Sequence, residues 1–227
     1  MNTLFIAELK ELIAEKHLLQ HPFYRMWEAG TLPPSALKHY AEQYYHLERN
    51  FPRFLSRIHT DCDNPAERQV ITDNMYDEEH GPANHRELWL RFAEAVGAER
   101  DMVEQSDQLP ETREAIATFE RLAGESTLAG VSALAAYESQ IPEVAGSKLQ
   151  GLAKYYGVTA ERGTAFFRVH QGLDAEHAAA WWQIIDERSA TPEAKQSARA
   201  AVVAGRDALW NFLTGVCRAC VPEALTC

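Results

Sequence analysis

Two histidines and one aspartate in the C-terminal half of the chain have the spacing of metal ligands. His170, Asp174 and His177 follow one another at intervals of four and three residues. On an α-helix, offsets of four and seven residues return to nearly the same face. Imidazole and carboxylate ligands together favour iron or manganese over structural zinc, which prefers thiolate. The alternative is that these three polar residues face solvent. Aromatic neighbours such as Phe166 and Trp181 instead favour a helix face that is turned toward the protein interior.

Further candidate ligands lie on other segments, because one helix cannot enclose a metal. Glu78 and His85 are seven residues apart, and Pro82 between them predicts a kink or a break in the helix. Glu138 follows residues 128–137, the least polar helical stretch, where an unpaired carboxylate would be costly to bury. A helix end rich in acidic residues, or a solvent-facing Glu138, are the alternatives that the residues themselves leave open.

Together these positions supply two glutamates, one aspartate and three histidines. Six such ligands are a natural set for two metals that share carboxylates inside a helical bundle. The Glu-x-x-His pairs of ferritin-like proteins are absent, and Asp174 with His177 is the nearest equivalent. A dimetal site here would therefore belong to a different lineage.

The elements that must position these residues are predicted to be helices. No segment alternates apolar and polar residues, and only 12 glycines interrupt the chain. We expect an all-α bundle with its longest loop at 98–110 and a flexible tail after about residue 216. Helices are predicted over residues 3–19, 22–29, 34–48, 51–62, 65–80, 83–97, 110–123, 126–141, 143–157, 159–187 and 191–216.

Composition narrows the class of protein. The chain has 227 residues, of which 46% are hydrophobic and 24% charged, as expected for a single globular domain over residues 1–227. Its net charge of -11 argues against nucleic acid and anionic membranes as partners. Without a signal peptide or a membrane-spanning run, the expected location is the cytoplasm. Cys217 and Cys220 read as two helical cysteines one turn apart, although a reversible disulfide in the tail stays open.

Four separate motifs in one order resemble a known family. They are His21 to Trp27, Asp77 to His85, Tyr137 to Pro142 and His170 to His177. Over about residues 4–187 the chain resembles the haem-oxygenase-like dimetal oxygenases, in the branch of the chlamydial protein associating with death domains. This branch is related in fold to the pyrroloquinoline-quinone biosynthesis oxidase. The resemblance implies a haem-oxygenase-like bundle in which Glu78, His85, Glu138, His170, Asp174 and His177 bind two metals.

The resemblance also implies an unusual reaction. The family is thought to form para-aminobenzoate, a folate precursor, with a tyrosine of the protein itself as the ring source. Tyr24 stands at the position of that tyrosine, Lys148 at that of the amino donor, and Tyr137 would be a second-shell or relay residue. The implied cofactors are Fe/Fe, Mn/Fe or Mn/Mn, with dioxygen and a reductant from an unidentified electron donor. A homodimer would be the commonest assembly.

Without the resemblance, the residues favour ordinary structural roles for two of these positions. Other functions are also compatible with the sequence. By composition, Tyr24 would be core packing and Lys148 an exposed lysine on a helix. A related oxygenase could act on an external small molecule, and a cofactor-free oxidase of the quinone-biosynthesis type would bind no metal. A hydrolase on the same fold would need a nucleophilic cysteine such as Cys62, and a helical interaction module would leave the ligand set idle.

Overall fold

The computed structural model describes residues 3–225, except the side chains of residue 3 and of residues 173–176. Within this part of the chain all regular structure is helical, as the sequence predicts. The elements in chain order are α1 (Thr3–Ala14), η1 (Leu18–Gln20), α2 (Pro22–Ala29), α3 (Pro34–Glu48), α4 (Phe51–Asp61), α5 (Pro65–Glu79), α6 (His85–Ala95), α7 (Arg100–Glu104), α8 (Pro110–Glu125), α9 (Thr127–Glu138), α10 (Ile141–Tyr155), α11 (Glu161–Arg188), α12 (Pro192–Cys220) and η2 (Pro222–Leu225).

Local sequence explains where the helices that carry the site begin. The side chains of Asn64 and Asn84 accept hydrogen bonds from the first backbone N–H groups of α5 and α6. Ser126 caps α9 in the same way, and the ring of His21 caps α2. Gly30 ends α2 in the left-handed conformation at φ 69°, which costs glycine little. These signals fix the register of the side chains that follow.

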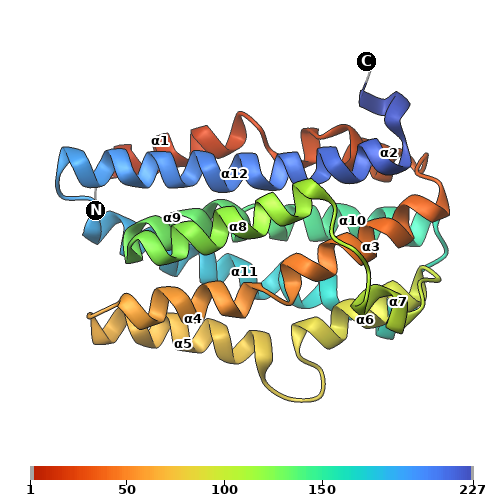
Figure 1. Cartoon of the computed structure of the whole chain (residues 1–227), viewed down its shortest axis with the longest axis horizontal. Helices are drawn as coiled ribbons and strands as arrows, with labels where there is room; N and C mark the ends of the chain where they lie inside the picture. The colour runs from red at the N-terminus through yellow and green to blue at the C-terminus, as the bar shows by residue number, and fades with distance from the viewer. Residues whose placement is uncertain (1–2, 226–227) are drawn as a thin grey trace.

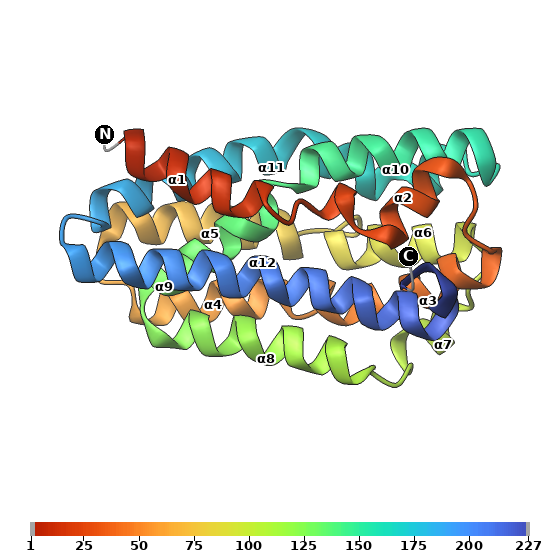
Figure 2. The same ribbon diagram turned by 90° about the horizontal axis from the view of Figure 1, so that it is seen from above.

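The helices run mostly along the long axis of the molecule (Figure 1). Helix α12 packs against α9 and α8 and lies beside α1, while α4 and α5 lie side by side on the opposite side of the bundle. The view from above places α10 and α11 together along one edge and α8 along the other (Figure 2). Helix α11 contacts α6, α9 and α10, so it is the element around which distant parts of the chain meet.

Three boundaries differ from the predicted ones. The short helix α7, Arg100–Glu104, lies inside the predicted loop 98–110, because Val103 is buried and holds this turn against the bundle. Helix α12 continues to Cys220, past the predicted end at 216, with Cys217 buried. The first predicted helix ends early at Ala14. None of the helices in the described residues is long and apolar enough to cross a membrane.

Candidate metal centre and its tyrosine–lysine network

Five helices bring acidic and imidazole side chains to the interior of the bundle. Glu48 and Glu138 are the last residues of α3 and α9, and Glu78 lies one residue before the end of α5. His85 is the first residue of α6, and His170 lies in α11. The predicted break at Pro82 is confirmed, because α5 and α6 are separate helices whose adjoining ends place Glu78 and His85 side by side.

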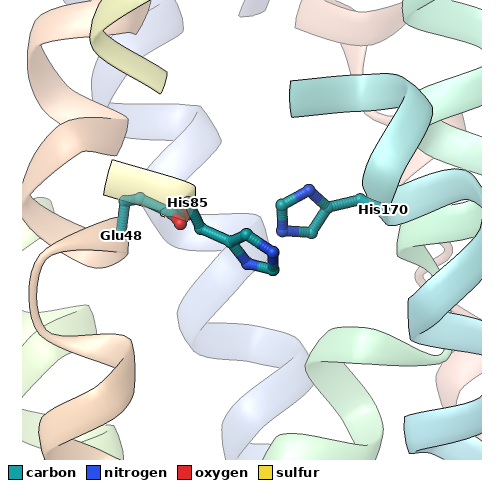
Figure 3. A group of neighbouring side chains, drawn as sticks. All are labelled: Glu48, His85 and His170. Atoms are coloured by element: carbon teal, nitrogen blue, oxygen red, sulfur yellow. The ribbon is translucent and has the colours of Figure 1, made fainter. Parts of the chain in front are cut away.

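Three buried side chains lie close enough together to form a metal-binding group. One ligand atom each from Glu48, His85 and His170 lie within 4.8 Å of one another. Figure 3 shows the two imidazole rings facing each other, with the Glu48 carboxylate on the far side of His85. The ring centroids of His85 and His170 are 4.3 Å apart, and His85 Nδ1 lies 3.0 Å from Glu78 Oε2.

Hydrogen bonds leave one ring nitrogen of each α11 histidine for the site. His170 Nδ1 donates to the Phe166 carbonyl at 2.7 Å, so Nε2 is available as a ligand. His177 Nε2 lies 3.1 Å from Asp77 Oδ2, and its Nδ1 lies 3.5 Å from Glu138 Oε1. Ligand histidines usually donate their second N–H to a carboxylate or carbonyl in this way, which fixes the orientation of the ring.

Glu138 is held by two donors and is only 2% exposed. Asn74 Nδ2 donates to its Oε1 at 2.9 Å, and Trp181 Nε1 donates to its Oε2. The solvent-facing alternative for Glu138 is therefore wrong, because the last turn of α9 is covered by α11 and α5. This buried carboxylate, with two neutral donors and the His177 ring 3.5 Å away, is suited to bind a cation.

The electrostatics of the cluster also fit a metal. Burial raises the pKa of Glu48 well above its ordinary value, and the Glu78 carboxylate adds to this rise. Burial acts to lower the pKa of His85, but the carboxylate of Glu78 more than offsets it. Among the described residues, Glu48 Oε1 and His177 Nδ1 are buried without a hydrogen-bond partner. Unpartnered nitrogen and oxygen atoms around mixed imidazole and carboxylate groups suit iron or manganese.

Five of the six predicted ligands thus lie in the interior of the bundle, and Glu48 is an additional candidate. The side chain of Asp174 lies outside the described residues. Glu48 was missed by the sequence reasoning, although Tyr40, Tyr44 and Glu48 recur every four residues in α3 and share its buried face. The position of Glu48 after two tyrosines at helical spacing could have identified it as a candidate in the sequence.

A second network lies beside these ligands and contains Tyr24 and Lys148. The hydroxyls of Tyr24 and Tyr40 are 2.9 Å apart, and Lys148 Nζ donates to the Tyr40 hydroxyl at 2.6 Å. Lys148 Nζ also lies 4.7 Å from the centre of the Tyr24 ring. The reading of Lys148 as an exposed lysine is wrong, because α10 turns this side chain inward and it is only 4% exposed.

Burial sets the charge state of this lysine. It lowers the pKa of the Lys148 amine well below its ordinary value, and the Glu48 carboxylate opposes this shift only in part. Rings of Tyr24, Tyr40 and Trp27 surround the nitrogen within 5.7 Å of their centroids. Because an amine in an apolar aromatic shell favours its neutral form, its lone pair is available for reaction with carbon.

Tyr137 connects the network to the ligands. Its hydroxyl donates to the Tyr44 hydroxyl at 2.7 Å, and the next residue along α9 is Glu138. An internal cavity of about 10 Å³ is lined by both tyrosines together with Glu48, Glu78 and His170, as well as Phe51, Glu138 and Ile141. This volume corresponds to about one water molecule. The tyrosines and the candidate ligands therefore share one small, enclosed space.

The three cysteines in the described part of the chain do not line this space. Cys62 follows α4, where its thiol donates to Glu67 and lies 3.9 Å from an Arg188 nitrogen. It is not in the position of a nucleophile facing the central cavity, so the hydrolase alternative loses its key residue. Cys217 and Cys220 lie on α12, and burial raises the pKa of the Cys220 thiol to about 11. The role of this pair stays open.

Comparison with known proteins identifies the family. A family model described as iron-containing redox enzyme matches residues 38–210. The 4-aminobenzoate synthase of Nitrosomonas europaea is 41% identical over 222 residues, which cover 93% of this chain and 90% of that protein. The chain therefore belongs to the family of iron-containing redox enzymes, and it is an oxidoreductase by class.

More distant proteins agree with the fold. The pyrroloquinoline-quinone synthase of Ruegeria pomeroyi is 26% identical over 217 residues, covering 91% of this chain and 87% of that protein. A domain of unknown function with a heme oxygenase-like fold from Shewanella denitrificans superposes with a TM-score of 0.81 at 18% identity, covering 94% of this chain and 92% of that one. The expected haem-oxygenase-like bundle and the resemblance stated from the motifs are both confirmed.

Proposed function

We propose that this protein forms 4-aminobenzoate from its own Tyr24, with dioxygen as oxidant, at a centre that holds two transition metals. The observation that carries this proposal is the contact of a buried amine with a buried tyrosine ring. Lys148 Nζ lies 4.7 Å from the Tyr24 ring centroid, beside the carboxylates and histidines of the candidate centre. The 41% identity to a 4-aminobenzoate synthase over nearly the whole chain supports the same reaction.

The chemistry of the side chain matches the product. Tyrosine contributes a six-carbon ring with oxygen para to Cβ, and 4-aminobenzoate has nitrogen at that position and a carboxylate in place of Cβ. Forming it requires cleavage of the Cα–Cβ bond, oxidation of Cβ to a carboxylate by dioxygen, loss of the phenol oxygen as water, and transfer of the Lys148 nitrogen to the ring with oxidative cleavage of its Nζ–Cε bond. Two reduced metal ions would supply the activation of dioxygen that the cleavage needs. The protein contributes proximity, because the Tyr24 ring and the Lys148 amine are already in contact.

The residues that would hold the metals are Glu78, His85, Glu138, His170, Asp174 and His177, and Glu48 is a seventh candidate. Either Fe/Fe, Mn/Fe or Mn/Mn suits this donor set. Asp77 orients His177, while Asn74 and Trp181 orient Glu138. The hydroxyls of Tyr44 and Tyr137 are hydrogen-bonded to each other, and both side chains line the cavity that several candidate ligands also line.

The size of the cavity favours a substrate that belongs to the protein. Its volume of about 10 Å³ corresponds to about one water or a dioxygen molecule. A substrate that is part of the protein needs no larger space. The cofactor-free alternative gives no role to the buried cluster in which Glu78 lies beside His85 and Glu138 beside His177.

The proposal is tested by metal content and intact mass before and after reaction. Protein loaded with iron, manganese or both is exposed to dioxygen and a reductant, and 4-aminobenzoate is assayed in the same tube. We expect two metals per chain, at most about one product per chain, and a mass change that maps to Tyr24.

Variants give the control for this experiment. Tyr24→Phe should bind metals normally and form no product, whereas Tyr155→Phe, at an exposed tyrosine, should behave as the wild type. Two metals with an unchanged chain and conversion of an added molecule would instead indicate an external substrate. Product at the wild-type yield from Tyr24→Phe would contradict self-sacrifice.

A further inference from the structure

A surface hollow leads to the candidate metal centre from outside. It has a volume of about 360 Å³. Its lining residues are Glu48, Arg49, Pro52, Glu78, Glu79, Asn84 and Arg86. Glu48 and Glu78 are buried and also line the internal cavity that Tyr44 and Tyr137 share. The hollow and the cavity thus share these two carboxylates as lining residues.

Two unpaired arginines stand at the mouth of this hollow. The side chains of Arg49 and Arg86 are exposed and form no hydrogen bond or ion pair with any described residue. Arg91 and Arg100 on the adjoining surface, by contrast, are both paired with Glu87. Free guanidinium groups at the rim of a polar hollow are available to a ligand.

Both guanidinium groups belong to side chains that line the same hollow. Pro52 and Arg86 also belong to the first turns of α4 and α6, whose N-terminal ends carry partial positive charge.

We propose that this hollow is the opening through which a small aromatic carboxylate passes between the centre and solvent, with Arg49 and Arg86 binding its carboxylate. The proposal rests on the proposed function, in which the product is such an anion formed in an enclosed site. Guanidinium groups match the planar, two-oxygen shape of a carboxylate better than an ammonium group does. Glu79, on the same lining, repels the anion and sets an upper limit on its affinity.

Binding of 4-aminobenzoate tests the recognition directly. The purified, metal-loaded protein is titrated with 4-aminobenzoate under nitrogen, so that no reaction occurs. The double variant Arg49→Gln/Arg86→Gln should bind at least about tenfold more weakly than the wild type, because two charge-assisted contacts are lost. Glu79→Gln should bind several-fold more tightly.

The matched control is Arg25→Gln/Arg113→Gln, which removes the same charge from exposed arginines that do not line the hollow. It should keep the wild-type affinity. The neutral analogue 4-aminobenzamide should bind equally to all variants, because it has no carboxylate. Equal 4-aminobenzoate affinity in the two double variants, or no saturable binding to the wild type, would overturn the proposal.

A bulky substitution in the hollow tests whether the product leaves through it. Glu79→Trp places a large side chain in the hollow, and Glu120→Trp places one on an exposed face of α8 as the control. After one reaction, the Glu79→Trp protein should contain as much 4-aminobenzoate as the control once denatured, but release it several-fold more slowly into a filtrate. Equal release rates would overturn the passage.

The two proposals fail in different ways. Arginine-dependent binding of 4-aminobenzoate by a protein that forms none would refute the proposed function and leave the anion site standing. Product formation with binding that does not depend on the arginines would do the reverse.

Discussion

The hydroxyl of Tyr40 links the Lys148 amine to the Tyr24 hydroxyl, and its removal should lower the free energy of unfolding. Tyr40 is fully buried, and its hydroxyl accepts from Lys148 Nζ at 2.6 Å and lies 2.9 Å from the Tyr24 hydroxyl. In Tyr40→Phe both partners stay buried and lose that bond. Each buried polar group left unsatisfied costs about 1–3 kcal/mol, so the free energy of unfolding should fall by about 2–6 kcal/mol. That is a large share of the roughly 5–15 kcal/mol typical of a domain.

Urea unfolding of the metal-free protein measures this loss. Tyr76→Phe is the control, because Tyr76 is 58% exposed and should lose less than about 0.5 kcal/mol. A double-mutant cycle with Lys148→Met isolates the contact: the double variant should lose about 1–2 kcal/mol less than the two single losses combined. A loss below about 1 kcal/mol for Tyr40→Phe, or no coupling to Lys148, would refute the geometry of this network.

Three further predictions follow from the site and its surroundings. Asp77→Asn should weaken metal binding about 10–100-fold in equilibrium dialysis, since it removes the carboxylate that orients His177; unchanged affinity would show that His177 is no ligand. Glu48→Gln should lower the metal content after dialysis, and an unchanged content would remove Glu48 from the ligand set. Burial lowers the pKa of His21 to about 4, whereas its pKa in the unfolded chain is about 6.5. The contribution of His21 to the free energy of unfolding is therefore fully present above pH of about 6.5, and up to about 3 kcal/mol is lost as the pH falls toward 4. His21→Asn, which can still cap α2, should lose less stability than the wild type between pH of about 7 and 5 in urea unfolding; an equal loss would contradict the assignment.

Most of the fold could be predicted because its signals are local. Proline and glycine mark the ends of the helices, and asparagine or serine caps begin α5, α6 and α9. The break at Pro82 follows from the missing backbone N–H. Helix α7 was missed because its five residues have too little length for a periodic pattern, and Val103 is held by tertiary packing.

The candidate site could be predicted only where spacing along one helix was informative. His170 and His177 share a face by periodicity alone, but the contacts of His177 with Glu138 and Asp77 depend on how α11 packs against α9 and α5. The burial of Lys148 likewise depends on which side of α10 faces the bundle, and the sequence around it permits either side. Glu48 is a single carboxylate at a helix end, and only the approach of α6 makes it a candidate ligand.

The origin of the product ring is the most direct test of the whole account. Protein is made with ring-¹³C tyrosine, freed of small molecules, loaded with metals, and reacted with dioxygen and a reductant in the presence of excess unlabelled tyrosine. We predict 4-aminobenzoate that carries the full ring label, together with loss of the Tyr24 side chain from the chain. Unlabelled 4-aminobenzoate, or labelled product from Tyr24→Phe, would contradict the claim that Tyr24 is the source of the ring.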